Sequence, residues 1–101
     1  MHIVRYTPAA RRRLREIYHY HADQGRRKYA KFITSELARY TDYLRKYAYI
    51  GYEDPTLSRR PLGYRTLLYN RRIKIVYYIQ PGGILVTDFF DVRQDPDRVR
   101  L

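Results

Sequence analysis

The chain has 101 residues, of which 21 are Lys or Arg and 10 are Asp or Glu, giving a formal net charge of +11. At this length we expect one domain, residues 1–101, with one modest core. The charge favours partners that are nucleic acids, acidic proteins or anionic membranes. The absence of cysteine excludes disulfide frameworks, thiolate metal sites and thiol nucleophiles.

Neither a membrane span nor a metal site is predicted. The opening residues MHIVRYTP lack the apolar core of a secretion signal, and no stretch approaches the roughly 18 apolar residues of a membrane span. His19 and His21 are two residues apart, so they do not share a helical face, and they lack ligand partners at metal spacing. We therefore expect a cytoplasmic protein without metal or other cofactor.

The first half of the chain predicts a strand and a helix. Residues 2–6 are a short β-branched opening, and Thr7-Pro8 is typical of a helix start, because Thr can cap free amides and Pro tolerates the first position. Apolar side chains at three-and-four spacing predict a helix over residues 8–22, ended by Gly25. The predicted buried face holds Ala10, Leu14, Ile17, Tyr18 and His21. The remaining basic residues, Arg11, Arg12, Arg13 and Arg15, are predicted to be solvated.

A second stripe with the same spacing predicts a second helix that packs on the first as an antiparallel hairpin. Its members are Ala30, Ile33, Leu37, Tyr40, Leu44 and Tyr47. Residues 48–63 follow and contain Gly51, Pro55, Pro61 and Gly63, so we predict a connecting loop there.

Beyond this loop the period changes to two, which predicts strands. Ile73, Ile75, Tyr77 and Ile79 alternate with Lys74, Val76 and Tyr78, so the two sets occupy opposite faces. Asn70-Arg71 and Pro81-Gly82-Gly83 are predicted to close two hairpins. The predicted fold is α+β in the order β-α-α-β-β-β, with the helical hairpin on one face of an antiparallel sheet.

The C-terminal 40 or so residues carry two specific motifs. The first has the form R-x-L-x-x-x-x-R-I-x-I-V-Y and runs from Arg65 to Tyr77, and the second, D-x-R-Q-D-P, runs from Asp91 to Pro96. Together with an opening strand, a helical hairpin and Gly51 after it, they resemble the RelE/ParE family of toxins from bacterial type II toxin-antitoxin modules.

The resemblance implies a growth-inhibiting toxin whose partner is an acidic antitoxin. RelE-like members cleave messenger RNA on the ribosome without a metal, by attack of the ribose 2′-OH on phosphorus, which requires cations to stabilise the phosphorane. By resemblance, Arg65, Lys74 and Arg93 are the catalytic phosphate-binding residues. Our preferred hypothesis is such an mRNA endonuclease, with RNA contacts from Arg71, Arg72 and Tyr78.

Other mechanisms stay open. Leu67 stands at the second basic position of its strand, Asp91 where some ribonucleases have His, and Val99 where they have a C-terminal Tyr. These differences favour the alternative ParE-like activity, poisoning of DNA gyrase by protein contact. Charge alone also allows a nucleic-acid-binding module without catalysis.

Overall fold

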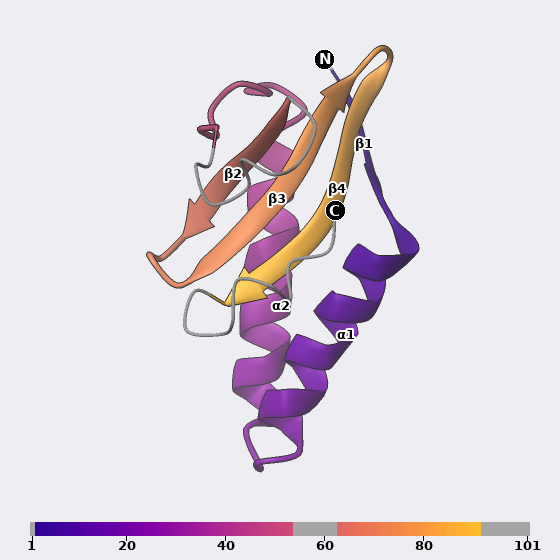
Figure 1. Cartoon of the computed structure of the whole chain (residues 1–101). Helices are drawn as coiled ribbons and strands as arrows, with labels where there is room; N and C mark the ends of the chain where they lie inside the picture. The colour runs from indigo at the N-terminus through magenta and orange to yellow at the C-terminus, as the bar shows by residue number, and fades with distance from the viewer. Residues whose placement is uncertain (1, 54–62, 92–101) are drawn as a thin grey trace.

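The computed structural model describes residues 2–53 and 63–91. Its elements are β1 (Ile3–Tyr6), α1 (Pro8–Ala22), α2 (Arg27–Tyr43), β2 (Tyr64–Tyr69), β3 (Ile73–Gln80) and β4 (Gly83–Asp91). Both helices cover the same side of the sheet (Figure 1). Neither described helix is long and apolar enough to cross a membrane. The predicted roles of Pro55, Pro61 and Arg93 fall outside the described residues.

The sheet has the strand order β1-β4-β3-β2. β2, β3 and β4 form the predicted antiparallel meander, whereas β1 pairs parallel with β4, from Ile3 opposite Gly83 to Tyr6 opposite Val86. The α+β class and element order are confirmed, but the sheet is mixed where we predicted an antiparallel one. The difference arises because alternation locates a strand in the sequence but does not say which sheet edge it joins or in which direction.

Local sequence features correctly predict both ends of α1 but not the C-terminal end of α2. The Thr7 hydroxyl accepts a hydrogen bond from the Ala10 amide at 3.0 Å, and Gly25 takes a positive φ of 78° after the helix, as predicted. α2 ends at Tyr43 and has Leu44 as its C-cap. Tyr47 therefore lies beyond the helix and is 54% exposed, so its predicted place in the core is wrong.

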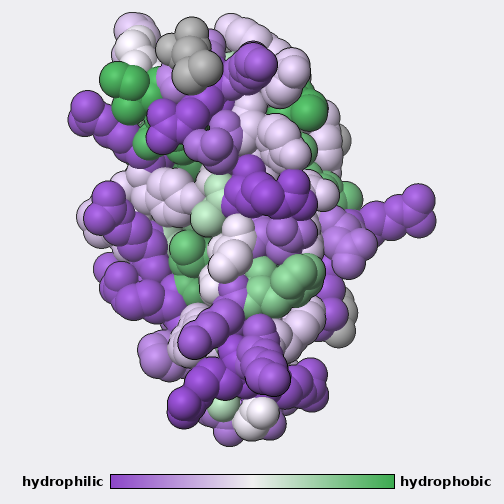
Figure 2. Space-filling model, turned by 180° about the vertical axis from the view of Figure 1, so that it is seen from behind, coloured by the Kyte–Doolittle hydropathy of each residue, from purple (hydrophilic) through white to green (hydrophobic). Residues whose placement is uncertain are grey.

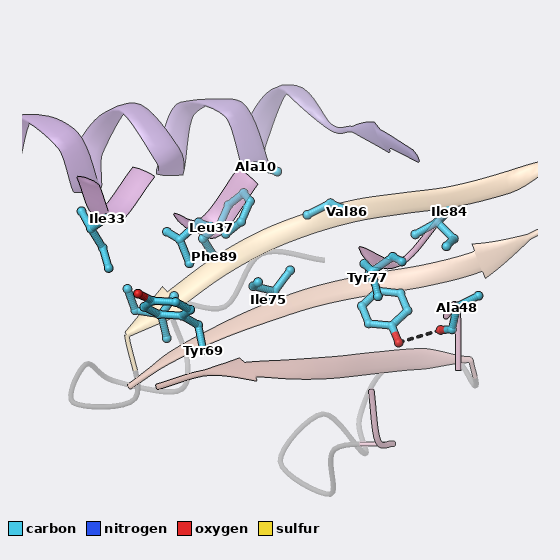
Figure 3. Close-up of a cluster of buried hydrophobic side chains, with 12 residues drawn as sticks. Ala10, Ile33, Leu37, Ala48, Tyr69, Ile75, Tyr77, Ile84, Val86 and Phe89 are labelled. Atoms are coloured by element: carbon cyan, nitrogen blue, oxygen red, sulfur yellow. Dashed lines mark hydrogen bonds between the residues drawn. The ribbon is translucent and has the colours of Figure 1, made fainter. Parts of the chain in front are cut away.

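The core lies between the helices and the sheet (Figure 3). α2 contributes Ile33 and Leu37, and the sheet contributes Ile75, Tyr77 and Phe89 among others. The predicted alternation along β3 is confirmed, since Ile73, Ile75 and Tyr77 belong to this core. Val76 instead joins a second cluster with Phe90 and Tyr64.

A β-bulge in β4 aligns the core residues of that strand. Val76 lies opposite Asp88 while Tyr77 lies opposite Val86, which leaves Thr87 as the extra residue. The Thr87 hydroxyl donates to the Val76 carbonyl at 3.3 Å. Because of the bulge, the residues facing the helices change from even to odd positions, so both Val86 and Phe89 reach the core.

An ion pair joins α1 to β4. The Arg13 Nε lies 3.2 Å from the Asp88 Oδ1, and the two side chains are 11% and 0% exposed. Our prediction that Arg13 is solvated is therefore wrong. Its position three residues after the buried Ala10 puts it at the margin of the core-facing stripe, where its long side chain reaches the carboxylate.

We expect Arg13→Ala to lower the free energy of unfolding by about 3–5 kcal/mol, because it removes a cation that is paired with a fully buried carboxylate. Chemical denaturation measures the change. The double variant Arg13→Met/Asp88→Leu is the control and should recover much of the loss, since it removes both charges. Equal losses in the two variants would contradict the electrostatic explanation.

Candidate functional site

A buried hydroxyl helps to attach the loop after α2 to the sheet. The Tyr77 side chain is fully buried, its hydroxyl donates to the Ala48 carbonyl at 2.7 Å, and it accepts from the Gly51 amide at 2.9 Å. Figure 3 shows this ring reaching from β3 toward Ala48. Burial raises the pKa of Tyr77, while the Gly51 amide and Arg65 oppose that rise. The loop is thus held in one position relative to β3.

Gly51 is required at the point of attachment. A Cβ at this residue would lie 2.6 Å from the Tyr77 hydroxyl and 2.7 Å from the Thr66 carbonyl oxygen. The next residue, Tyr52, exchanges two backbone hydrogen bonds with Thr66, of 3.0 and 2.8 Å. The loop can approach β2 this closely only because residue 51 lacks a side chain.

Arg65 is held by this loop. It lies opposite Tyr77 in the sheet register, so it faces the helix side. Its guanidinium donates to the Gly51 carbonyl at 2.5 Å and lies 5.0 Å from the centre of the Tyr49 ring. These contacts orient the cation at the end of the molecule where the loop follows α2.

Lys74 and Tyr78 face the other side of the sheet. Lys74 lies opposite Leu68 on one side and Phe90 on the other, and Tyr78 lies opposite Tyr64. The Tyr78 and Tyr64 ring centres are 5.2 Å apart. Tyr78 is therefore on the face predicted for it, where its ring packs against a neighbouring strand.

Arg71 and Arg72 belong to the tight turn between β2 and β3. Asn70 and Arg71 have positive φ angles of 50° and 58°, and the Arg72 amide donates to the Tyr69 carbonyl at 2.9 Å. This is the backbone of a type I′ turn, which normally has Gly at its second central position. Arg72 forms a longer ion pair of 3.8 Å with Asp91.

The structure does not bring the two described catalytic candidates together. Arg65 and Leu68 are three residues apart on β2, and Lys74 pairs with Leu68, so Arg65 and Lys74 lie on opposite faces of the sheet. The predicted RNA contacts are likewise divided between the turn and the far face. Arg93 lies outside the described residues, and its role stays a prediction.

A hollow of about 590 Å³ lies between the two helices and the sheet. Ile17, Ile33 and Phe89 are among its apolar lining residues, and Arg72 is the one predicted site residue among the described residues that line it. The surrounding helix surface is mostly hydrophilic, with small apolar patches between polar side chains (Figure 2). No group of three or more His, Asp or Glu in residues 2–53 and 63–91 is arranged to hold a metal.

Sequence reasoning missed the exposed aromatic residues of the loop after α2. Large side chains are exposed at four of its positions, namely Tyr47, Tyr49, Ile50 and Tyr52. The sequence carried a signal, because four large apolar residues in six positions are unusual for a polar connector. The sequence-based prediction instead places Tyr47 in the core and residues 48–63 in a connecting loop.

Comparisons with known proteins bear on the fold. No protein-family model matches the chain, and no curated protein matches it in sequence. The structure does match a chain of the solved "Chromosomal ParDE TA system from P. aeruginosa", with a TM-score of 0.76 and 19% sequence identity, over 91% of this chain and 97% of that chain. The chain has the RelE/ParE-type fold. At this identity the likeness concerns the fold, and the fold predicted from the resemblance is confirmed.

We expect Arg71→Gly to raise the free energy of unfolding by about 0.5–1 kcal/mol, because Gly adopts the left-handed backbone without the steric cost that Arg pays. Urea denaturation measures the change. The matched control is Arg72→Gly, which relieves no positive φ and should destabilise the protein. A loss of stability in Arg71→Gly would contradict this account of the turn.

We expect Tyr77→Phe to cost about 1–3 kcal/mol near neutral pH, because it leaves the Ala48 carbonyl and Gly51 amide without their partner. The raised pKa of Tyr77 adds a pH dependence. Its stabilising contribution is complete below the ordinary tyrosine pKa of about 10 and is lost as the pH rises toward the folded-state value. Denaturation at about pH 8 and about pH 11 should therefore show a smaller alkaline loss in Tyr77→Phe than in the wild type. The exposed Tyr20→Phe serves as control and should behave like the wild type.

Proposed function

We propose that this protein is the toxin of a type II toxin-antitoxin module. The observation that carries the proposal is the match, over 91% of the chain, to a chain of a ParDE TA system. The sequence motifs in Arg65–Tyr77 and Asp91–Pro96 support it independently, because they resemble motifs of RelE/ParE toxins in sequence alone. The excess of 21 basic over 10 acidic residues also suits a protein that is neutralised by an acidic antitoxin.

Of the two mechanisms, we favour inhibition of a protein target, DNA gyrase, through direct contact. Metal-independent RNA cleavage needs several cations around one phosphate. Arg65 and Lys74 face opposite sides of the sheet, and Arg65 already donates to the Gly51 carbonyl. A surface contact with a protein does not require that these cations converge.

Cleavage of mRNA on the ribosome is the second candidate, supported by one feature of the sheet. Lys74 and Tyr78 are four residues apart on β3 and share the face opposite the helices. A cation and an aromatic ring on the same face of a sheet can bind a phosphate and stack a base of one RNA strand. In this candidate mechanism the site lies on that face and uses Lys74 without Arg65.

Purified protein added to gyrase, ATP and supercoiled plasmid tests the favoured mechanism. We expect linear plasmid after protease treatment, because a poison traps the cleaved complex. In parallel, translating ribosomes supplied with the protein should leave transcripts intact. Transcripts with 2′,3′-cyclic phosphate ends, formed in the presence of chelator and without linear plasmid, would establish the second candidate instead. Absence of growth inhibition on expression in bacteria would refute the toxin proposal itself.

A further inference from the structure

Four large side chains are exposed within six consecutive residues of the loop that follows α2. Tyr47, Tyr49, Ile50 and Tyr52 are 54%, 69%, 56% and 46% exposed. We call these four residues the 47–52 patch. Grouped exposed apolar side chains on a small protein mark contact surfaces more often than single ones do.

The backbone beneath the patch is fixed before any partner binds. Ala48 and Gly51 are hydrogen-bonded to the buried Tyr77 hydroxyl, and Tyr52 is paired in both directions with Thr66. Arg65 adds a hydrogen bond to the Gly51 carbonyl. A loop already held in its bound shape loses little conformational entropy on binding, which is the property of a preorganised contact surface.

The composition of the patch matches a protein partner better than a nucleic acid. Tyrosine and arginine are enriched among the residues that dominate protein interfaces, and an exposed aliphatic such as Ile50 gains from burial against another protein. Single-stranded nucleic acid instead calls for a groove of cations along the backbone. Near the patch, Arg45 is already paired with Asp42 at 2.6 Å.

The positive charge of the chain and of Arg65 indicates which kind of protein partner fits the patch. A second copy of the chain carries the same formal charge of +11, so self-association through this patch is opposed by repulsion. In the described part of the chain, Arg65 directs one N–H group to Gly51, and the guanidinium has further N–H groups beside Tyr49. Those donors suit a carboxylate that lies next to apolar side chains on the partner.

We propose that the 47–52 patch, with Arg65 at its side, is the surface through which the protein contacts its protein target, and that the matching surface combines apolar side chains with a carboxylate. This inference rests on the proposed function and deepens it by naming the contact surface. Tyr49 and Ile50 are the central contacts, because they are the most exposed members of the patch.

The double variant Tyr49→Ala/Ile50→Ala tests the proposal. Both side chains are more than half exposed, so thermal unfolding should stay near that of the wild type. We expect the concentration that gives half-maximal plasmid linearisation by gyrase to rise roughly tenfold or more. Growth inhibition at matched expression should fall in parallel. The control is Phe32→Ala on α2, an equally exposed aromatic residue at 55%, which should retain both activities.

Two readouts separate failure of this inference from failure of the proposed function. Full toxicity and full plasmid linearisation by the double variant would overturn the patch. A wild-type protein that is toxic but does not trap gyrase would refute the gyrase mechanism. In that case the patch would still be supported if the double variant lost toxicity while Phe32→Ala kept it. A photoreactive residue at position 50 should cross-link to protein in growth-inhibited cells, and adducts formed with RNA would overturn the proposed partner class.

Discussion

The Tyr77 hydroxyl makes the interaction on which the rest of the described surface depends. This polar group lies inside the core and forms two hydrogen bonds there, one to the Ala48 carbonyl and one from the Gly51 amide. A buried hydroxyl without partners would be costly, so the hydrogen bonds restrict where the loop can lie. The position of Arg65 and the exposure of Tyr49 follow from that restriction, because Tyr49 belongs to the loop and Arg65 contacts it.

The sheet register has the largest consequence for mechanism. A side chain on a strand can face only one side, so pairing Arg65 with Tyr77 and Lys74 with Leu68 separates the two cations by the thickness of the sheet. No rotamer change reverses this, since only a shift of register would move either residue to the other face. Abundant positive charge therefore does not by itself bring these two cations to one face of the sheet. Net charge affects the rate at which a polyanion associates with the protein. The strand register determines where on the surface the cations that bind it are located.

Two kinds of surface result from this arrangement. The helices expose basic side chains, among them Arg11, Arg12 and Lys28, and such a surface suits an acidic protein partner. The 47–52 patch is smaller, more aromatic and held by the sheet. In the function that we propose, an antitoxin neutralises the protein through charge and the target is contacted through the patch. The proposal therefore assigns the two roles to different residues.

Local sequence determined much of the fold. The Thr7-Pro8 start, the apolar stripes of both helices, the alternation along Ile73–Gln80 and the two hairpin turns all depend on neighbouring residues, and each was predictable. The sequence does not reveal that Tyr47 lies past the end of α2, because the helical spacing of apolar residues continues to Tyr47 although the helix ends at Tyr43.

Only the tertiary structure decided the features that join distant residues. These are the parallel pairing of β1 with β4, the ion pair between Arg13 and Asp88, and the attachment of the loop at Gly51 to Tyr77. The same holds for the separation of Arg65 from Lys74, which needs the register between β2 and β3. Residue spacing gives the periodicity of one segment, whereas edge choice, register and long-range hydrogen bonds depend on how the whole chain packs.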